Sequence, residues 1–206
     1  RLYLTLFAGK DAFINKPGDT RNGLEWGNSA ITLRWWHIYG NRLFSNTTFY
    51  ASRYDYSLYT NYDRKIRWNS DITGTNLKSE FSWYITPKNS LKFGFNLGGY
   101  FFNPGNYISD NPALDTMRVS QVNSGEYVLY AGNEVEPLKW LKVNYGLRFS
   151  GWSNYGEAFS IVYNNVHEPV SYMEYEKGTR YYSKNLLEPR ISVSFKTGRT
   201  AAVKAS

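Results

Sequence analysis

Cysteine is absent from this chain of 206 residues. Its absence excludes a disulfide framework, thiolate metal ligands and a cysteine nucleophile. The sequence also contains no apolar run near the roughly 18 residues that a membrane-spanning helix needs, and its mean hydropathy is -0.54. A membrane is not excluded, because a spanning β-strand needs only about ten alternating residues, half of which are polar.

Motifs of the common catalytic and metal sites are lacking as well. The stretch VHEPV around His167 begins like a zinc-protease helix, but the position four residues further on is Ser171, and Pro169 is incompatible with a helix interior. The stretch GFNLGG lacks the spacing of a dinucleotide-binding loop, and no GxSxG motif or phosphate-binding loop occurs. We therefore expect no catalytic residue, no metal site, no cofactor and no enzymatic activity.

The first residues, RLYLTLFAGKDAF, lack the basic region, the continuous apolar core and the cleavage site of a signal peptide. Either the protein is not exported or its beginning is missing. The net charge of +7 suits nucleic acid, an anionic membrane surface or an acidic ligand. The basic stretch DRKIRW at 63–68 is better explained by a solvated loop near anionic lipopolysaccharide than by nucleic-acid binding, because no RNA-recognition motif accompanies it.

Aromatic residues are abundant, at 18% of the chain, and they favour β-strands over helices. Alternation of apolar and polar residues predicts nine strands, at 2–8, 28–37, 43–56, 76–85, 91–98, 126–135, 141–150, 187–196 and 200–206. The predicted connections are alternately short and long. The long ones are 11–23, 57–71, 103–121 and 151–185. In an up-and-down meander, this alternation places all short turns on one rim and all long loops on the other.

Each predicted strand has one apolar and one polar face. In the last long strand the apolar face consists of Leu187, Pro189, Ile191, Val193 and Phe195, and the polar face of Glu188, Arg190, Ser192, Ser194 and Lys196. A soluble sandwich would cover the apolar face with a second sheet. The pairing of strands in sequence order and polar faces rich in Gly and Ser favour a barrel in lipid with a water-filled lumen. Aromatic residues near three short turns suggest a belt at the headgroups: Trp35, Trp36, Tyr39, Trp83, Tyr84 and Trp140. The predicted fold class is all-β, an antiparallel up-and-down meander of about nine strands forming part of a large transmembrane β-barrel.

Four segments carry a family resemblance: LEWGNSAITLRWWHIYGNRLFSNTTFYASRYDYSLY, ITPKNSLKFGFNLGGYFFNPG, LKWLKVNYGLRFSGW and LEPRISVSFKTGRTAAVKAS. In this order they resemble the barrel of TonB-dependent outer-membrane receptors, particularly those of the Bacteroidetes type. The resemblance implies a barrel of about 22 strands with a plugged lumen. Residues 1–206 are then expected to be a partial barrel segment with two open edges, and the plug and the remaining strands to lie in other parts of the polypeptide.

The resemblance also implies active uptake of a scarce nutrient, such as a ferric siderophore, cobalamin or an oligosaccharide, across the outer membrane of a Gram-negative bacterium. The implied partners are outer-membrane lipid and lipopolysaccharide, the plug domain of the same polypeptide, the TonB complex and a surface lipoprotein, with no nucleic acid. Six cations on predicted polar faces are expected to line the lumen, where they can pair with plug carboxylates: Arg34, Lys78, Lys92, Lys142, Arg148 and Arg190.

Ligand in such receptors binds between the extracellular loops and the plug, where aromatic rings stack on flat groups and cations meet anions. Candidate ligand-binding residues on the long-loop rim are Tyr54, Tyr56, Tyr62, Arg64, Arg67, Trp68, Trp152, Tyr155, Tyr172 and Tyr175. Two alternatives remain open. A passive porin or adhesin barrel would lack a plug and a TonB-contacting segment upstream, and a soluble carbohydrate-binding β-protein would be monodisperse without detergent.

Overall fold

The computed structural model describes residues 1–16, 18, 21–61, 65–109, 119–198 and 201–205. Nine strands form one sheet in the order β1-β2-β3-β4-β5-β6-β7-β10-β11. Their bounds are β1 Leu2–Asn15, β2 Asn22–Ile38, β3 Leu43–Asn61, β4 Lys65–Thr86, β5 Asn89–Ser109, β6 Val122–Leu138, β7 Leu141–Tyr155, β10 Arg180–Lys196 and β11 Ala202–Ala205. Each strand pairs antiparallel with its neighbours, so the predicted all-β meander is confirmed.

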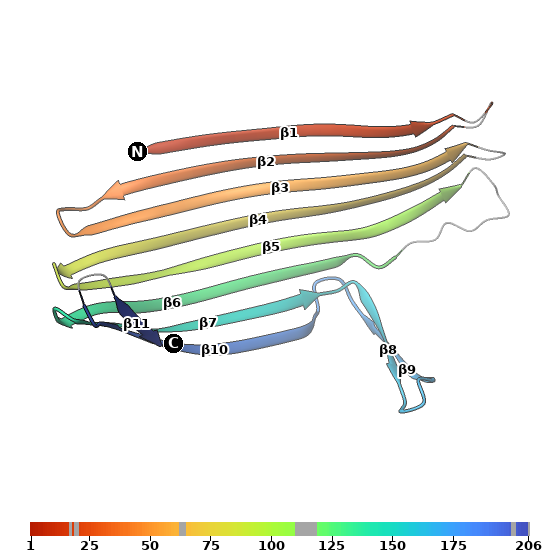
Figure 1. Cartoon of the computed structure of the whole chain (residues 1–206). Helices are drawn as coiled ribbons and strands as arrows, with labels where there is room; N and C mark the ends of the chain where they lie inside the picture. Colours follow the sequence, from red (N-terminus) through yellow and green to blue (C-terminus); the bar gives the residue numbers. More distant parts are fainter. Residues whose placement is uncertain (17, 19–20, 62–64, 110–118, 199–200, 206) are drawn as a thin grey trace.

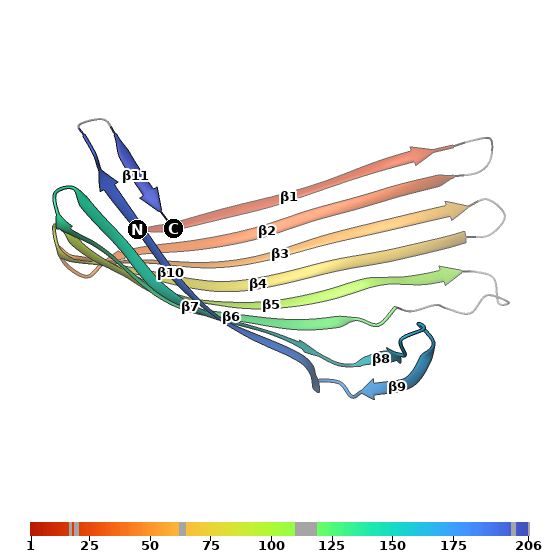
Figure 2. The same cartoon turned by 60° about the horizontal axis from the view of Figure 1, so that its bottom comes forward.

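The connections lie at the two ends of the strands as predicted (Figure 1). The turns β2–β3, β4–β5, β6–β7 and β10–β11 share one end, which we call the short-turn end, and the other connections share the opposite end. The connection from β7 to β10 contains a separate hairpin of β8 (Ala158–Tyr163) and β9 (Pro169–Tyr175), which extends beyond the main sheet (Figure 2). Within the described residues, no helix has the length and apolar character needed to cross a membrane.

Most strands are longer than predicted, and most of the added length lies at the end away from the short turns. β4 begins at Lys65 instead of about residue 76, β5 continues to Ser109, and β1 continues to Asn15. Much of the predicted loops 11–23 and 57–71 is therefore strand, and the β8–β9 hairpin inside 151–185 was missed. The physical reason is that the apolar residues change sides along the strands, which interrupts the alternation although the backbone pairing continues.

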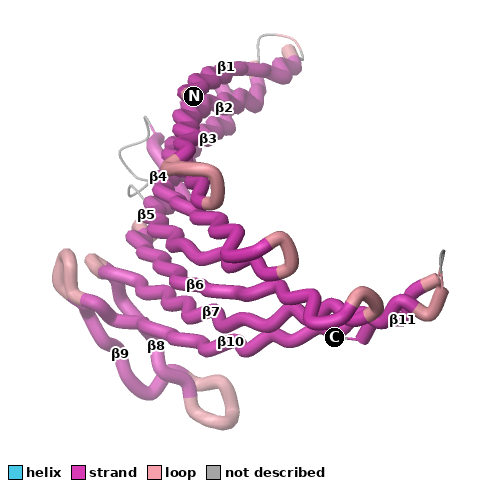
Figure 3. Tube along the Cα trace, turned by 90° about the vertical axis from the view of Figure 1, so that its left-hand side faces the viewer, coloured by secondary structure: helices cyan, strands magenta, loops and turns pink. Residues whose placement is uncertain are grey.

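The sheet curves into an open arc when it is seen nearly along its strands (Figure 3). β1 and β11 each pair with a single neighbour among the described residues. Burial is correspondingly low: in the described part of the chain, Val128 is the one hydrophobic residue in the buried class, while Leu6 is 68% and Ile191 65% exposed. A single curved layer of this kind needs an apolar medium or further protein against its faces.

Candidate functional site

An apolar band covers the outer, convex face of the sheet in the half next to the short turns. One row of paired residues crosses four strands, from Leu33 through Phe49 and Leu77 to Leu97. Other members of the band are Leu2, Leu4, Leu6, Ile31, Phe81, Phe93, Phe95, Leu129, Val143, Leu147, Phe149, Leu187, Pro189, Ile191, Val193 and Phe195. On β5 the band extends from Leu91 to Phe101, which is close to the roughly ten residues of a membrane-spanning strand.

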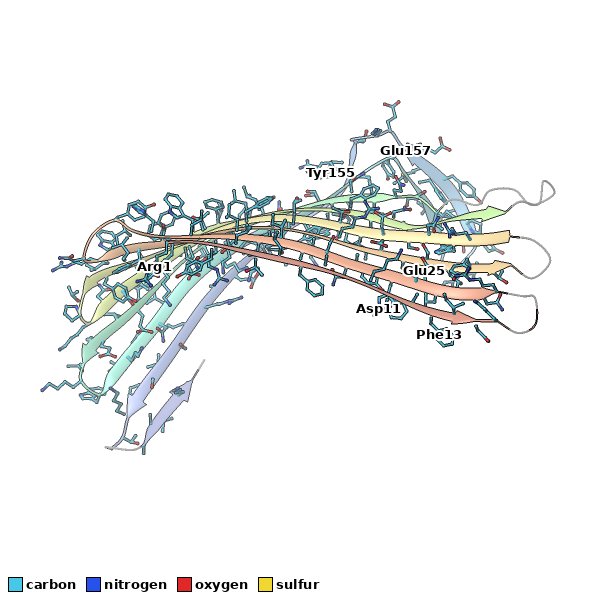
Figure 4. The ribbon with its side chains drawn as sticks, turned by 90° about the horizontal axis from the view of Figure 1, so that it is seen from above. Arg1, Asp11, Phe13, Glu25, Tyr155 and Glu157 are labelled. Carbon is cyan, nitrogen blue, oxygen red and sulfur yellow. The ribbon has the colours of Figure 1, made fainter. Side chains whose placement is uncertain are left out.

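Aromatic rings gather on this outer face near the short-turn end (Figure 4). Phe81 and Phe93 stack with their centroids 5.1 Å apart, and Trp140 and Phe195 stack at 6.1 Å. Trp35, Tyr39 and Trp83 belong to the same region and are 44 to 52% exposed. Trp36 and Tyr84 lie on the inner face instead, Tyr84 lining the groove there, so the predicted belt is wrong for these two residues.

The inner, concave face of the same half is polar. It forms a groove of about 1460 Å³ whose lining includes Arg34, Lys78, Lys92, Arg148 and Arg190. These are five of the six cations expected there, and the sixth, Lys142, pairs with Glu134 of the same groove at 2.6 Å.

Besides Lys142, three of these cations have carboxylate partners on the inner face. Lys78 lies 3.8 Å from Glu80, and Glu188 pairs with Arg148 at 3.8 Å and with Arg190 at 2.8 Å. Arg34 and Lys92 have no carboxylate within 4 Å among the described residues. Among the described residues that line the groove, Arg34 and Lys92 are thus the two cations available to an external anion.

Two tyrosines reach across neighbouring strands to glutamates in the groove. The Tyr130 hydroxyl donates to Glu80 Oε2 at 2.9 Å, and Gly94 lies between them in the sheet. A side chain at Gly94 would collide with the Ser79 carbonyl and the Tyr130 ring. In the same way the Tyr100 hydroxyl donates to Glu126 at 3.2 Å, with its ring close to Gly98. Glycine at positions 94 and 98 therefore makes room for the two tyrosine rings.

Further from the short turns the polarity of the two faces is exchanged. The inner face there carries a set of aromatic and aliphatic residues that we call the aromatic wall: Phe13, Leu24, Trp26, Tyr54, Tyr56, Leu58, Trp68, Ile72, Tyr100, Phe102 and Trp152. Tyr100 stacks with Trp152 at 5.5 Å and with Phe102 at 6.2 Å. Phe13, Leu24, Leu58 and Trp68 line a pocket of about 530 Å³. In Figure 4, Asp11 and Phe13 project from the same side of β1.

The outer face of this second half is mainly polar. Lys10 pairs with Glu25 at 3.6 Å, and Asp71 receives a hydrogen bond from Asn103 at 2.8 Å and lies 3.9 Å from Arg53. The guanidinium groups of Arg21 and Arg67 lie 5.8 and 5.9 Å from the Tyr59 ring centroid. Ala12, Ile14, Tyr59 and Tyr155 depart from this polar character.

The structure divides the predicted ligand-binding residues between the two faces. Tyr54, Tyr56, Trp68 and Trp152 lie on the inner face and belong to the aromatic wall, whereas Arg67 and Tyr155 lie on the outer face. All of these are strand residues and not loop residues. Tyr172 and Tyr175 lie on β9, where Tyr175 stacks on Tyr181 at 5.2 Å. Tyr62 and Arg64 lie outside the described residues.

Sequence reasoning missed several members of the aromatic wall, above all Phe13, Trp26, Leu58 and Phe102. The signal that would have found them is a switch of the apolar residues from odd-numbered to even-numbered positions within one strand. In β4 the odd-numbered positions from Leu77 to Ile85 are mainly apolar, whereas the apolar residues Ile72 and Trp68 occupy even-numbered positions. Within the described residues, no group of three or more His, Asp or Glu side chains is arranged to hold a metal ion.

Comparisons with known proteins agree with the fold. No protein-family model and no curated protein matches the sequence. Among solved structures, the ferric preacinetobactin receptor BauA of Acinetobacter baumannii matches with a TM-score of 0.60 at 9% identity, over 89% of this chain and 30% of the receptor. The ferric-catecholate import receptor Fiu of E. coli K12, in its open form, matches with a TM-score of 0.53 at 12% identity, over 89% of this chain and 35% of that receptor.

The chain thus spans about a third of the length of the solved receptors it matches. At these identities the likeness concerns the fold. The nine-stranded antiparallel meander has the fold of a fragment of these solved receptors, in agreement with the all-β meander predicted from the sequence.

Proposed function

We propose that residues 1–206 form part of the β-barrel of a TonB-dependent receptor, which imports a scarce nutrient across the outer membrane of a Gram-negative bacterium. The Bacteroidetes-type assignment rests on the sequence resemblance. The remaining strands close the barrel along β1 and β11, which have open edges among the described residues. An edge in hydrocarbon requires such a partner because its backbone groups find no water there.

The observation that carries this proposal is the exchange of polarity between the two halves of the sheet. An outer face that is apolar over roughly ten residues of each strand and polar beyond them fits a wall that crosses a bilayer and continues into water. A soluble sandwich would keep its apolar residues on one face throughout, because that face meets the same second sheet along the whole strand. A passive porin does not account for an aromatic inner wall above a polar lumen.

The aromatic wall is the proposed ligand-binding surface. Tyr54, Leu58 and Ile72 are 42 to 49% exposed, so they present free apolar area toward the interior. Aromatic faces stack on flat or apolar groups and on cations. Ferric complexes of aromatic siderophores offer flat aromatic groups of this kind, and both solved neighbours are named for ferric ligands. Cobalamin and oligosaccharides, which also offer apolar faces, are the other ligand classes to test.

The proposed partners follow the same division of the surface. Lipid contacts the apolar band, and lipopolysaccharide contacts the polar outer face above it, where Arg21 and Arg67 flank Tyr59. A plug domain of the same polypeptide occupies the polar groove and transmits the action of TonB. A surface lipoprotein at the far end is a further candidate partner, facing the β8–β9 hairpin.

The test is uptake by cells that carry the complete receptor gene. We expect radiolabelled ferric siderophore, or another ligand from the panel, to accumulate only in cells with an energised TonB system. Binding to the purified receptor in detergent should persist without TonB. Uptake that is unchanged in cells without TonB would favour the porin alternative, and a monodisperse protein without detergent would favour the soluble one.

A further inference from the structure

The aromatic wall contains a pocket of about 530 Å³ at the end of the sheet away from the short turns, which we call the rim pocket. Four of its residues are paired in a single row across β1 to β4: Phe13, Leu24, Leu58 and Trp68. The two leucines lie in the middle of the row, and the two rings lie at its ends, about 14 Å apart between Cα atoms for three strand spacings. The volume is that of a small-molecule site.

No charged side chain is found among the described residues that line the rim pocket. Its polar members are Asn15, Asn22, Tyr59 and Thr60. The cations Arg21 and Arg67 lie against the Tyr59 ring on the outer face instead. Placing an unpaired charge in an uncharged pocket is costly, and aromatic rings favour flat partners. The pocket therefore suits a flat, uncharged group.

A β-bulge in the neighbouring strand lies beside Trp68. Opposite Ser70 of β4, β5 has two residues, Pro104 and Gly105, where regular pairing would place one. Gly105 has a φ of 145°, in a region that residues with a side chain rarely adopt. Bulges often change the direction of a side chain next to a functional site. The side chain affected at this bulge is the indole of Trp68.

The bulge holds the Trp68 ring in two ways. A Cβ atom at position 105 would overlap Cε2, Cζ2 and Nε1 of the indole, so only glycine leaves room for the ring. The Trp68 Nε1–H group donates to Ser70 Oγ at 2.8 Å, and the Ser70 hydroxyl donates to the Pro104 carbonyl at 2.7 Å. The ring is thus fixed by contact with Gly105 and by two consecutive hydrogen bonds.

Trp68 differs from the other tryptophan of the wall that has a hydrogen-bonded indole. Trp152 also donates its Nε1–H group to a residue two positions further on, Asn154, at 2.6 Å. Its ring is already stacked on Tyr100 at 5.5 Å. None of the described aromatic rings stacks on Trp68. Trp68 is therefore a fixed ring that still has a face to offer.

We propose that the Pro104–Gly105 bulge and Ser70 position Trp68 as a wall of the rim pocket, and that this pocket binds a flat, uncharged group of the ligand. The inference rests on the proposed function, because it deepens the role of the aromatic wall in ligand binding. A ring that is fixed before binding loses little freedom when the ligand arrives, and this preorganisation raises affinity. Ser70 and Gly105 are positioning residues, which act through Trp68.

The experiment measures binding of indole, a flat and uncharged probe, to the complete receptor in lipid nanodiscs. Equilibrium dialysis of radiolabelled indole, with empty nanodiscs as the blank, gives the Kd. Indole carboxylate, an anion of similar shape, should bind at least about tenfold more weakly. Fluorine NMR of receptor labelled with fluorotryptophan reports the surroundings of Trp68, whose resonance is identified by its loss in Trp68→Phe.

The variants separate positioning from a merely structural role. Ser70→Ala should shift the Trp68 resonance and raise the Kd of indole about fivefold, because the indole loses its hydrogen bond. Ser70→Thr keeps the hydroxyl and should retain the parent Kd. Trp68→Phe lacks the N–H group, so adding Ser70→Ala to it should weaken binding no further. Gly105→Ala forces the ring from its place and should raise the Kd at least about tenfold.

Two matched controls should leave the Kd and the Trp68 resonance unchanged. Ser57→Ala removes a serine hydroxyl that donates to Asn69 at 2.8 Å on the outer face of the neighbouring strand. Gly178→Ala places a side chain at a φ of 83°, where no atom lies within 4 Å. It therefore has backbone strain of the kind expected for Gly105→Ala, without a collision with a ring.

Each outcome supports or overturns a defined part of the proposal. Additive effects of Ser70→Ala and Trp68→Phe, an unchanged Kd in Ser70→Ala, or an equal effect of Ser57→Ala overturns the positioning role. Unheated gel electrophoresis checks that each barrel is assembled, and the serine variants decide the matter if Gly105→Ala does not assemble.

The outcomes also distinguish this inference from the proposed function. A receptor that imports its nutrient with TonB but does not bind indole, or binds the anion as tightly, overturns the rim pocket and leaves the proposed function standing. Uptake that does not need TonB overturns the proposed function, whatever the result with indole.

Discussion

The two halves of this sheet have opposite amphipathic character although they are built from the same strands. Next to the short turns, the outer face is apolar and the inner face carries paired charges such as Arg148 and Glu188. Toward the other end, the outer face carries charged and polar groups such as Arg53 and Asp71, and the inner face carries aromatic rings such as Tyr100 and Trp152. The difference indicates that the outer face has different surroundings in the two halves, and so does the inner face.

The exchange occurs without any break in the backbone pairing. β3 and β4 remain in continuous register from Leu43 and Trp83 to Asn61 and Lys65. Hydrogen bonds along the sheet are therefore independent of which face is apolar, whereas the side chains respond to the surroundings at each height. On the proposed function, one set of strands forms both the lipid-facing wall and the ligand-facing wall.

The largest expected effect comes from placing a charge on the outer face at different heights of one strand. Leu129→Arg lies in the apolar band of β6, and we expect the complete receptor to lose about 2–4 kcal/mol of stability, the cost of Arg near the bilayer midplane. Asn123→Arg lies on the same face beyond the band and should change stability by less than about 0.5 kcal/mol. Urea titration of folding in lipid vesicles measures both, and equal costs would contradict the division of the outer face.

The next effect tests the packing of the polar inner half. Gly94→Val should cost about 1–3 kcal/mol, because the new side chain collides with the Ser79 carbonyl and displaces Tyr130 from Glu80. Gly132→Ala, on the same face, has free space and should be tolerated. The same vesicle titration compares them. If Gly132→Ala were the more damaging substitution, the free space around Gly132 would be contradicted.

Ligand affinity should depend on the inner face of the far half and not on its outer face. Trp68→Ala or Tyr54→Ala removes an aromatic contact, and we expect the Kd of the complete receptor for its ligand to rise about tenfold, in line with 1–1.5 kcal/mol per lost aromatic contact. Tyr155→Ala, on the outer face, is the control and should leave the Kd unchanged. Isothermal titration calorimetry measures the three values, and an effect confined to Tyr155 would contradict the aromatic wall.

A smaller effect is expected for the hydrogen bond between Tyr130 and Glu80. Tyr130→Phe keeps the ring over Gly94 and should cost about 1 kcal/mol, near the value of a single hydrogen bond in a partly hydrated site. A double-mutant cycle with Glu80→Gln isolates the coupling between the two side chains. If the effects of the two substitutions on stability were strictly additive, the contact would contribute no coupling energy.

The smallest effect belongs to the exposed ion pair of the outer face. Lys10 and Glu25 lie 3.6 Å apart, with the Lys10 side chain 69% exposed, and the double-mutant cycle of Lys10→Ala and Glu25→Ala should give a coupling below about 1 kcal/mol. The coupling should decrease further at high salt because exposed charges are screened. A large, salt-independent value would mean that this part of the outer face is not exposed to water.

The sequence predicted the half of the fold in which alternation is uninterrupted. The strands around Leu77–Ile85, Leu91–Leu97 and Leu187–Phe195 and the short turns between strands were found because a single phase of the period-two pattern identifies them. The far half was predicted as loops. In that half the apolar residues move from one face of the strand to the other, as from Leu77 to Ile72 in β4. Polar groups on both faces weaken the alternating pattern further.

The candidate site was predicted in the same uneven way. Residue types and their position near the long connections selected Tyr54, Tyr56, Trp68 and Trp152, which the structure brings to one face. The same criteria selected Arg67 and Tyr155, which face outward. Whether an odd or an even position faces inward can be decided only when the strand that contains the residue is known. The sequence did not give the full strand bounds, so these residues could not be assigned to a face.

Composition and local periodicity alone determined that the chain forms an antiparallel meander with an apolar and a polar face, because these properties depend on neighbouring residues. The tertiary structure decided where the two faces exchange polarity and that Lys92, Gly132, Gly146 and Arg190 share one row. These properties depend on strand register and on the curvature of the sheet, which bring together residues that are far apart in the chain.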